Sequence, residues 1–237
     1  MIEITIFILA VFQSIFGVGL LVLGTPILLL LDFEFFKILN ILLPCSMAVS
    51  LMQINKIKNY KIIETKIIFI SLPCIILGLT TLILFQEHIN FKLLIGFMIL
   101  ISFIIKSYFR KKFEILILEK KKYILPGAAF FHGLTNTGGT IISLIFQTLR
   151  KNKFEIQSNI AFTYFFFSLV QYSIISLYFN QIFFDKTNII YVLISLFAYF
   201  LGANLLYKIS NNKFIEILNI LIIFTSLYLI ISGLSYL

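Results

Sequence analysis

Eight long runs of apolar residues constrain this chain more than any other feature of its sequence. They lie at 2–31, 36–54, 62–85, 91–105, 123–149, 156–179, 187–207 and 214–237. A helix needs about 20 apolar residues to cross a bilayer, and only the fourth run is short unless it extends to Tyr108. The runs do not alternate apolar and polar residues as barrel strands do, and a helix satisfies its backbone groups within one segment. We therefore expect an all-α polytopic membrane protein with about eight transmembrane helices.

Charged residues are too few to cover a water-facing surface. They make up 12% of the 237 residues, whereas 60% are hydrophobic, and soluble domains carry about 25% charged residues. Lys and Arg exceed Asp and Glu by 19 to 10, mostly in the short connections between the runs. This placement is typical of topology signals and of contact with anionic lipid head groups. We expect the lipid bilayer as a partner, and no nucleic acid.

The distribution of basic residues predicts the orientation. If all eight runs cross, the side shared with both termini holds 12 Lys and Arg residues and the other side holds 7. Basic residues favour the cytoplasmic side, so we expect a multi-pass protein of the cell membrane with both termini in the cytoplasm. The orientation inverts if the first and fifth runs enter and return. The first residues lack a basic n-region, so no cleavable signal peptide is expected.

The two halves of the chain resemble each other after a shift of 119 residues. The shift pairs Phe12 with Phe131, Gln13 with His132, Gly19 with Gly138, Asn40 with Asn159 and Ile41 with Ile160. We expect a first transmembrane repeat at 1–109, a basic linker at 110–122 and a second repeat at 123–237. Four helices in each half, an even number, predict parallel repeats related by an axis along the membrane normal.

The first and fifth runs are long for one crossing, and small residues interrupt both. The first contains Gly17, Gly19 and Pro26, and the fifth contains Gly138 and Gly139. Broken helices at matched positions of two halves are typical of a transporter binding site. A break leaves backbone N–H groups at the start of a half-helix, where they bind an anion without a charged side chain. Close packing of helices is the alternative explanation for each glycine motif taken singly.

At these two motifs the sequence resembles the TauE/SafE sulfite-exporter family. Members open each half with a glycine-rich helix of the form G-x-x-x-G-x-G-G-G, followed by a proline. The second half fits this form, with Asn136 where a glycine is usual, whereas the first half has Leu20 and Leu21 in place of the later glycines and keeps Pro26. The resemblance implies two similar membrane halves and transport of small anions, among them sulfite and organosulfonates.

Polar and small residues within the runs are the candidates for substrate binding. They are Gln13, Gly17, Gly19, Pro26, Asn40, His132, Asn136, Thr137, Gly138, Gly139 and Asn159. His132 is the one ionisable residue deep in an expected crossing, so it either carries a coupling proton or donates to a backbone carbonyl near the start of its helix. The paired Asn40 and Asn159 either line a path or bond between helices.

The sequence lacks the motifs of an enzyme or a pump. It has no HExxH, P-loop or nucleophile elbow, and no loop large enough for a catalytic or ATP-binding domain. We expect no catalytic residue, metal or cofactor. The function expected is secondary transport of a small anion, coupled to a proton or sodium, with the site between the two repeats. The alternatives are a membrane scaffold without a transport cycle and an intramembrane enzyme that uses His132.

Overall fold

The structure is a computed structural model that describes residues 2–56, 65–150, 152–179 and 186–205, together with part of 208–234. The described residues form helices and no strand. The elements are α1 (Ile2–Phe16), α2 (Gly24–Leu30), α3 (Phe35–Lys56), α4 (Thr65–Phe85), η1 (Gln86–His88), α5 (Phe91–Tyr108), α6 (Arg110–Thr135), α7 (Gly139–Leu149), α8 (Lys153–Tyr178) and α9 (Lys186–Leu205). The all-helical class expected from the sequence is confirmed.

Four of the described helices are long and apolar enough to cross a membrane. They are Phe35–Asn55, Thr65–His88, Lys153–Tyr178 and Lys186–Leu205. Shorter apolar helices occupy Ile2–Phe16, Phe91–Ile105 and Gly139–Leu149. The eighth expected run, 214–237, falls largely outside the described residues. Eight crossings therefore remain a prediction.

The first and fifth runs are each divided, as their glycines predict. The first forms α1 and α2, with no helix between Phe16 and Gly24, and the fifth forms the end of α6 and then α7. The basic segment 110–122 is itself helical and forms the first part of α6. The backbone leaves helical geometry at Lys120, with φ −121° and ψ 24°. The part of α6 that follows Lys120 corresponds to α1 under the 119-residue shift.

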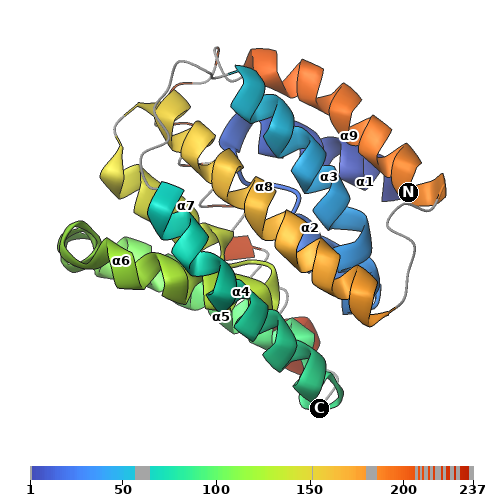
Figure 1. Cartoon of the computed structure of the whole chain (residues 1–237), viewed down its shortest axis with the longest axis horizontal. Helices are drawn as coiled ribbons and strands as arrows, with labels where there is room; N and C mark the ends of the chain where they lie inside the picture. Colours follow the sequence, from blue (N-terminus) through green and yellow to red (C-terminus); the bar gives the residue numbers. More distant parts are fainter. Residues whose placement is uncertain are drawn as a thin grey trace.

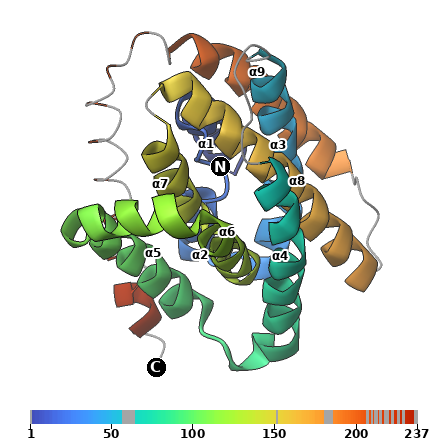
Figure 2. The same ribbon diagram turned by 60° about the vertical axis from the view of Figure 1, so that its left-hand side comes forward.

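The packing of the helices is nearly symmetric between the two halves of the chain. α3 and α8 pack together at the centre, α9 lies beside α3, and α4 lies beside α8 (Figures 1 and 2). α1 packs on α9, and α6 packs on α4. Under the shift, α3 corresponds to α8 and α4 to α9. The first helix of each half thus packs on the last long described helix of the other half, so the two halves are interleaved.

Glycines allow the closest of these helix contacts. A Cβ atom at Gly78 of α4 would overlap the backbone oxygen of Phe130, and one at Gly133 of α6 would overlap that of Ile75. The backbones of α4 and α6 therefore touch where these glycines lie. This is the close packing that small residues permit between membrane helices. Gly133, although it lies in the glycine-rich motif, is a packing residue.

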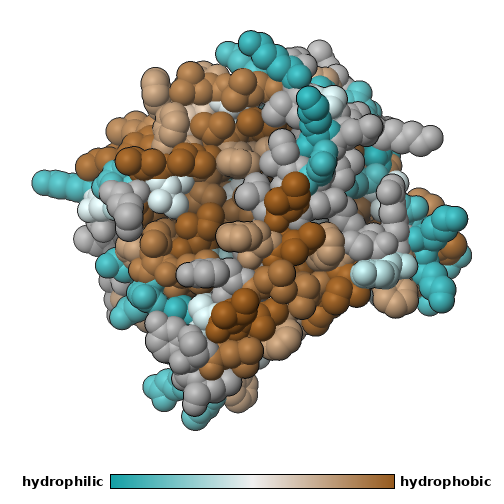
Figure 3. Space-filling model, turned by 180° about the vertical axis from the view of Figure 1, so that it is seen from behind, coloured by the Kyte–Doolittle hydropathy of each residue, from teal (hydrophilic) through white to brown (hydrophobic). Residues whose placement is uncertain are grey.

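The distribution of polarity is the reverse of that in a soluble protein. Large apolar side chains are exposed, for example Leu84 at 77% and Phe197 at 63%. Gln13, His132 and Gln171 are fully buried. Figure 3 shows a broad hydrophobic field on the face turned away from the viewer in Figure 1, with hydrophilic residues mostly at its margins. An apolar exterior around a polar interior fits a lipid environment.

Candidate functional site

The two breaks begin with the same left-handed backbone turn, although α2 starts at Gly24 and α7 already at Gly139. The residue that turns the chain out of the first helix is Gly17, at φ +74°, and its counterpart under the shift is Asn136, at φ +58°. Both adopt the left-handed conformation, which glycine enters freely and asparagine tolerates better than most residues. Asn136 is therefore an acceptable substitute where the family pattern has a glycine.

A second pair of glycines lets each break fold back on the helix before it. A Cβ atom at Gly19 would lie 2.5 Å from the backbone nitrogen of Gln13. A Cβ atom at Gly138 would lie 2.7 Å from the backbone nitrogen of His132. Gln13 and His132 are themselves a pair under the shift. The two breaks therefore repeat not only in sequence position but also in the atoms that they bring together.

The two breaks also meet in space. The side-chain nitrogen Nδ2 of Asn136 donates to Thr25 Oγ1 at 2.9 Å. A Cβ atom at Gly139 would lie 2.8 Å from Cγ2 of Val22. Thr25 belongs to the first turn of α2, and Gly139 begins α7. The broken segments from the two halves thus form one buried region.

At the first break the polar groups bind one another. The Gln13 side chain donates through Nε2 to the backbone oxygen of Ser46 at 3.2 Å, to Ser46 Oγ at 3.1 Å and to Ser50 Oγ at 3.2 Å. Its Oε1 accepts the backbone N–H of Leu20 at 3.2 Å. Gln13, predicted as a substrate ligand, therefore has its hydrogen-bonding groups engaged within the protein.

Two further glutamines satisfy carbonyl groups at the end of α1. Gln53 Nε2 donates to the backbone oxygen of Gln13 at 2.8 Å, and Gln157 Nε2 donates to that of Ser14 at 2.6 Å. The last carbonyls of a helix lack partners within the helix, so these side chains cap α1 from α3 and α8. Gln157 was not among the predicted site residues, since a single glutamine near a helix start gives no distinctive signal.

At the second break the corresponding groups are left without partners. The His132 ring stacks on Tyr164, with centroids 5.5 Å apart and planes at 17°. Within the part of the chain that the structure describes, neither ring nitrogen of His132 has a hydrogen-bond partner, nor does the Tyr164 hydroxyl. Both residues are 0% exposed. A Cβ atom at Gly139 would overlap the Tyr164 hydroxyl, which therefore lies directly against the start of α7.

A polar stripe on α8 continues from Tyr164. Ser168 and Gln171 follow at helical spacing, and among the described residues Ser168 Oγ and both polar atoms of the Gln171 side chain have no partner. The spacing equals that of Ser46, Ser50 and Gln53 on α3. Tyr164 was not among the predicted site residues, because composition does not distinguish a functional tyrosine from the other aromatic residues of a phenylalanine-rich run.

Some of the remaining predicted residues lie at the breaks, and others lie elsewhere on α3 and α8. Thr137 Oγ1 bonds Thr135 Oγ1 at 3.0 Å within the second break, and Pro26 is buried in the first turn of α2. Asn40 is partly exposed on α3. Asn159 Nδ2 donates to the Glu155 backbone oxygen of its own helix at 2.8 Å. The structure therefore places Asn159 in the polar start of α8 rather than at the breaks.

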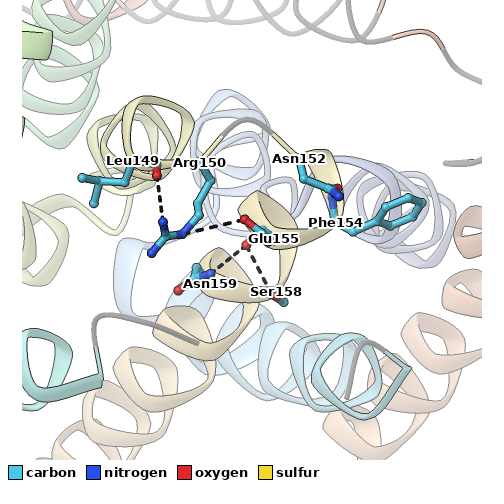
Figure 4. Close-up of polar contacts among 7 residues, drawn as sticks. All are labelled: Leu149, Arg150, Asn152, Phe154, Glu155, Ser158 and Asn159. Atoms are coloured by element: carbon cyan, nitrogen blue, oxygen red, sulfur yellow. Dashed lines mark hydrogen bonds and ion pairs between the residues drawn. The ribbon is translucent and has the colours of Figure 1, made fainter. Parts of the chain in front are cut away.

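That polar start surrounds the turn from α7 into α8 (Figure 4). Arg150 Nη1 donates to the Leu149 backbone oxygen at 3.0 Å, and Arg150 Nε lies 4.0 Å from Glu155 Oε2. Asn152 accepts the Phe154 N–H at 2.9 Å and caps α8. The charge of Arg150 is thus partly balanced by Glu155.

A surface pocket of about 370 Å³ lies between the α2–α3 turn and the start of α5. Asp32, Glu34 and Lys92 line it. Lys92 Nζ is paired with Asp32 Oδ1 at 2.7 Å. The second carboxylate leaves the pocket with a negative balance, so it does not suit an anionic ligand.

The family model described as "Sulfite exporter TauE/SafE" matches residues 3–229. The chain belongs to the TauE/SafE family. The resemblance inferred from the two glycine motifs is thereby confirmed, and it extends over nearly the whole chain. No curated protein and no solved structure matches the chain.

Membership of TauE/SafE agrees with the structure on the class of protein. The family consists of membrane transporters of sulfite and related anions, and the chain has the long apolar helices of a membrane protein. Transport is thereby favoured over catalysis. Among the described residues, no group of three or more His, Cys, Asp and Glu residues is placed to hold a metal ion.

Proposed function

We propose that this TauE/SafE protein is a secondary transporter of a small anion of the sulfite or organosulfonate type. The site lies between the two halves, where the broken helices meet. One observation carries the proposal: the second break holds fully buried donors without partners, beside the first residue of α7. Burying a donor without a partner is unfavourable, so a ligand that accepts from these groups is stabilised there.

The chemistry of the region favours an anion with a single charge. The Gly139 N–H and the macrodipole of the 11-residue helix α7 attract negative charge, whereas the N–H groups of Thr140 and Ile141 donate to the backbone oxygens of Thr137 and Gly138. Among the described residues, no Lys, Arg, Asp or Glu is buried. The desolvation penalty of an ion rises with the square of its charge, so neutral donors balance one negative charge far better than two. Organosulfonates and hydrogensulfite fit this requirement better than sulfate.

The matching construction of the two breaks supports a transporter built from two parallel repeats. A movement of one half against the other would expose a site between them to each side of the membrane in turn. His132 is the candidate carrier of a coupling proton, since it is fully buried at the site; sodium is the alternative coupling ion. The cell membrane location and cytoplasmic termini belong to the same proposal.

A thermal-shift screen in detergent tests the proposal. The panel consists of sulfite, thiosulfate, methanesulfonate, a longer organosulfonate, sulfate and acetate. A ligand present at 100 times its Kd stabilises the folded protein by about 2.7 kcal/mol, so a sulfonate or sulfite should raise the melting temperature measurably. A membrane scaffold without a transport cycle predicts no anion-dependent shift, and a flat response across the panel would refute the proposal.

A further inference from the structure

We infer that the two breaks are functionally unequal: the first is closed by the Gln13 side chain, and the second binds the anion. At the second break, an oxygen atom of the anion takes the place that Gln13 Oε1 occupies at the first. This inference rests on the proposed function and names the residues of that site. His132, Tyr164 and the N–H of Gly139 are the groups that hold the oxyanion.

The first step rests on the pairing of positions in the two breaks, although the helix after the break begins at Gly24 in the first and at Gly139 in the second. The 119-residue shift pairs Gln13 with His132 and Leu20 with Gly139. At the first break the Leu20 N–H donates to Gln13 Oε1 at 3.2 Å. The corresponding N–H belongs to Gly139, the first residue of α7, a position with no acceptor inside its own helix. At the first break a side-chain oxygen accepts this N–H, and at the second break an oxygen atom of the anion can take the same position.

The side chains around the two breaks differ in whether they have hydrogen-bond partners. Gln13 bonds Ser46 and Ser50 of the α3 stripe. Tyr164, Ser168 and Gln171 on α8 have the same spacing, at an offset of 118 rather than 119 residues, but in the described part of the chain the Ser168 and Gln171 side chains lack partners. At the first break Gln53 Oε1 is likewise without a partner, but the other side-chain groups there are engaged. Unpaired polar groups are therefore concentrated at the second break.

Tyr164 joins the stripe to the start of α7. Its hydroxyl lies against Gly139, and its ring stacks on His132. Only glycine permits this contact, because a Cβ atom at position 139 would overlap the hydroxyl. All three residues are buried. For the anion to reach Gly139, the Tyr164 ring must move aside while its hydroxyl stays within reach of the ligand.

Three neutral donors match the three oxygen atoms of a sulfonate or hydrogensulfite head group. The Gly139 N–H, the Tyr164 hydroxyl and a His132 ring N–H approach from three different segments of the chain: the start of α7, α8 and the end of α6. The Tyr164 hydroxyl is the group that sequence reasoning did not assign. We therefore expect it to set affinity for the anion directly.

Two variants at the second break test the inference. His132→Gln places at the second break the side chain that closes the first, so its amide oxygen can accept the Gly139 N–H. Tyr164→Phe keeps the ring on Gly139 and removes the donor. Two control variants remove hydroxyls elsewhere: Ser50→Ala loses a Gln13 contact, and Tyr199→Phe loses the hydrogen bond to the Met52 backbone oxygen at 3.1 Å. Methanesulfonate is the probe, and its Kd is measured from thermal shifts of the purified protein.

We expect His132→Gln and Tyr164→Phe to fold and to bind methanesulfonate at least tenfold more weakly than the wild type. The two controls should lower the melting temperature and keep the wild-type Kd. If His132→Gln does not fold, Tyr164→Phe alone decides. Wild-type affinity in Tyr164→Phe would overturn the inference and leave the proposed function standing. Absence of any anion-dependent shift in the wild type would overturn both.

Discussion

Replacing Gly138 by alanine should destabilise the protein, because its Cβ position is already occupied by backbone atoms. The added Cβ atom would lie 2.7 Å from the His132 nitrogen, 2.8 Å from the His132 Cα atom and 2.9 Å from the Ala128 oxygen. Backbone atoms cannot rotate away as a side chain does, so the second break must open. Such overpacking costs about 1–3 kcal/mol.

Gly127 provides the control, because it lies in α6, the helix that Gly138 packs against. A Cβ atom there meets nothing within 4 Å, and alanine in a helix interior is favoured over glycine by about 0.5–1 kcal/mol. Gly127→Ala should therefore stabilise the protein slightly. The two variants should differ by about 1.5–4 kcal/mol, which corresponds to at least about 3 °C in Tm for a chain of this length.

The assay is thermal unfolding of the purified variants in one detergent, without added anion. Gly19→Ala should resemble Gly138→Ala, because its Cβ atom would lie 2.5 Å from the Gln13 backbone nitrogen. A Tm for Gly138→Ala equal to or above that of Gly127→Ala would refute the reasoning, since it would show that the second break is not packed against α6.

Three further predictions concern the first break, the left-handed turn and the topology. Gln13→Met keeps the side-chain length but leaves Ser46 Oγ, Ser50 Oγ and the Leu20 N–H without this partner; at about 1–3 kcal/mol for each unsatisfied buried group, it should lower the Tm more than Gly138→Ala does. Asn136→Val should cost about 1–2 kcal/mol more than Asn136→Gly, because a β-branched residue resists positive φ; equal Tm values would contradict the left-handed turn. Reporter fusions at each terminus should be active only in the cytoplasm, and a signal from the opposite side of the membrane at either end would overturn the expected orientation.

The helical class and the two breaks were predictable from sequence, because each follows from local features. Apolar runs require helices in lipid, and glycines at matched positions interrupt them. The 119-residue shift also pairs Gly17 with Asn136, the two residues that the structure shows in the left-handed conformation at the breaks. The family was recognisable from the same two motifs.

The side chains that contact each break were not predictable from the sequence, because they depend on how the helices pack. Nothing in the local sequence indicates that α1 packs on α9 and α6 on α4. For the same reason, Gln13 and His132 looked equivalent, although α3 offers hydroxyl partners to one and aromatic rings of α8 face the other. Asn40 and Asn159 repeat in sequence, yet Asn159 bonds to its own helix.

Flux of methanesulfonate into proteoliposomes tests the central claim most directly. Wild-type protein should carry the anion at a rate above that of protein-free liposomes, and Tyr164→Phe should reduce this rate at least tenfold at subsaturating concentration. Sulfate, which has a similar head group but two charges, should compete weakly. Flux through the wild type no greater than through protein-free liposomes, for methanesulfonate and sulfite alike, would contradict the account.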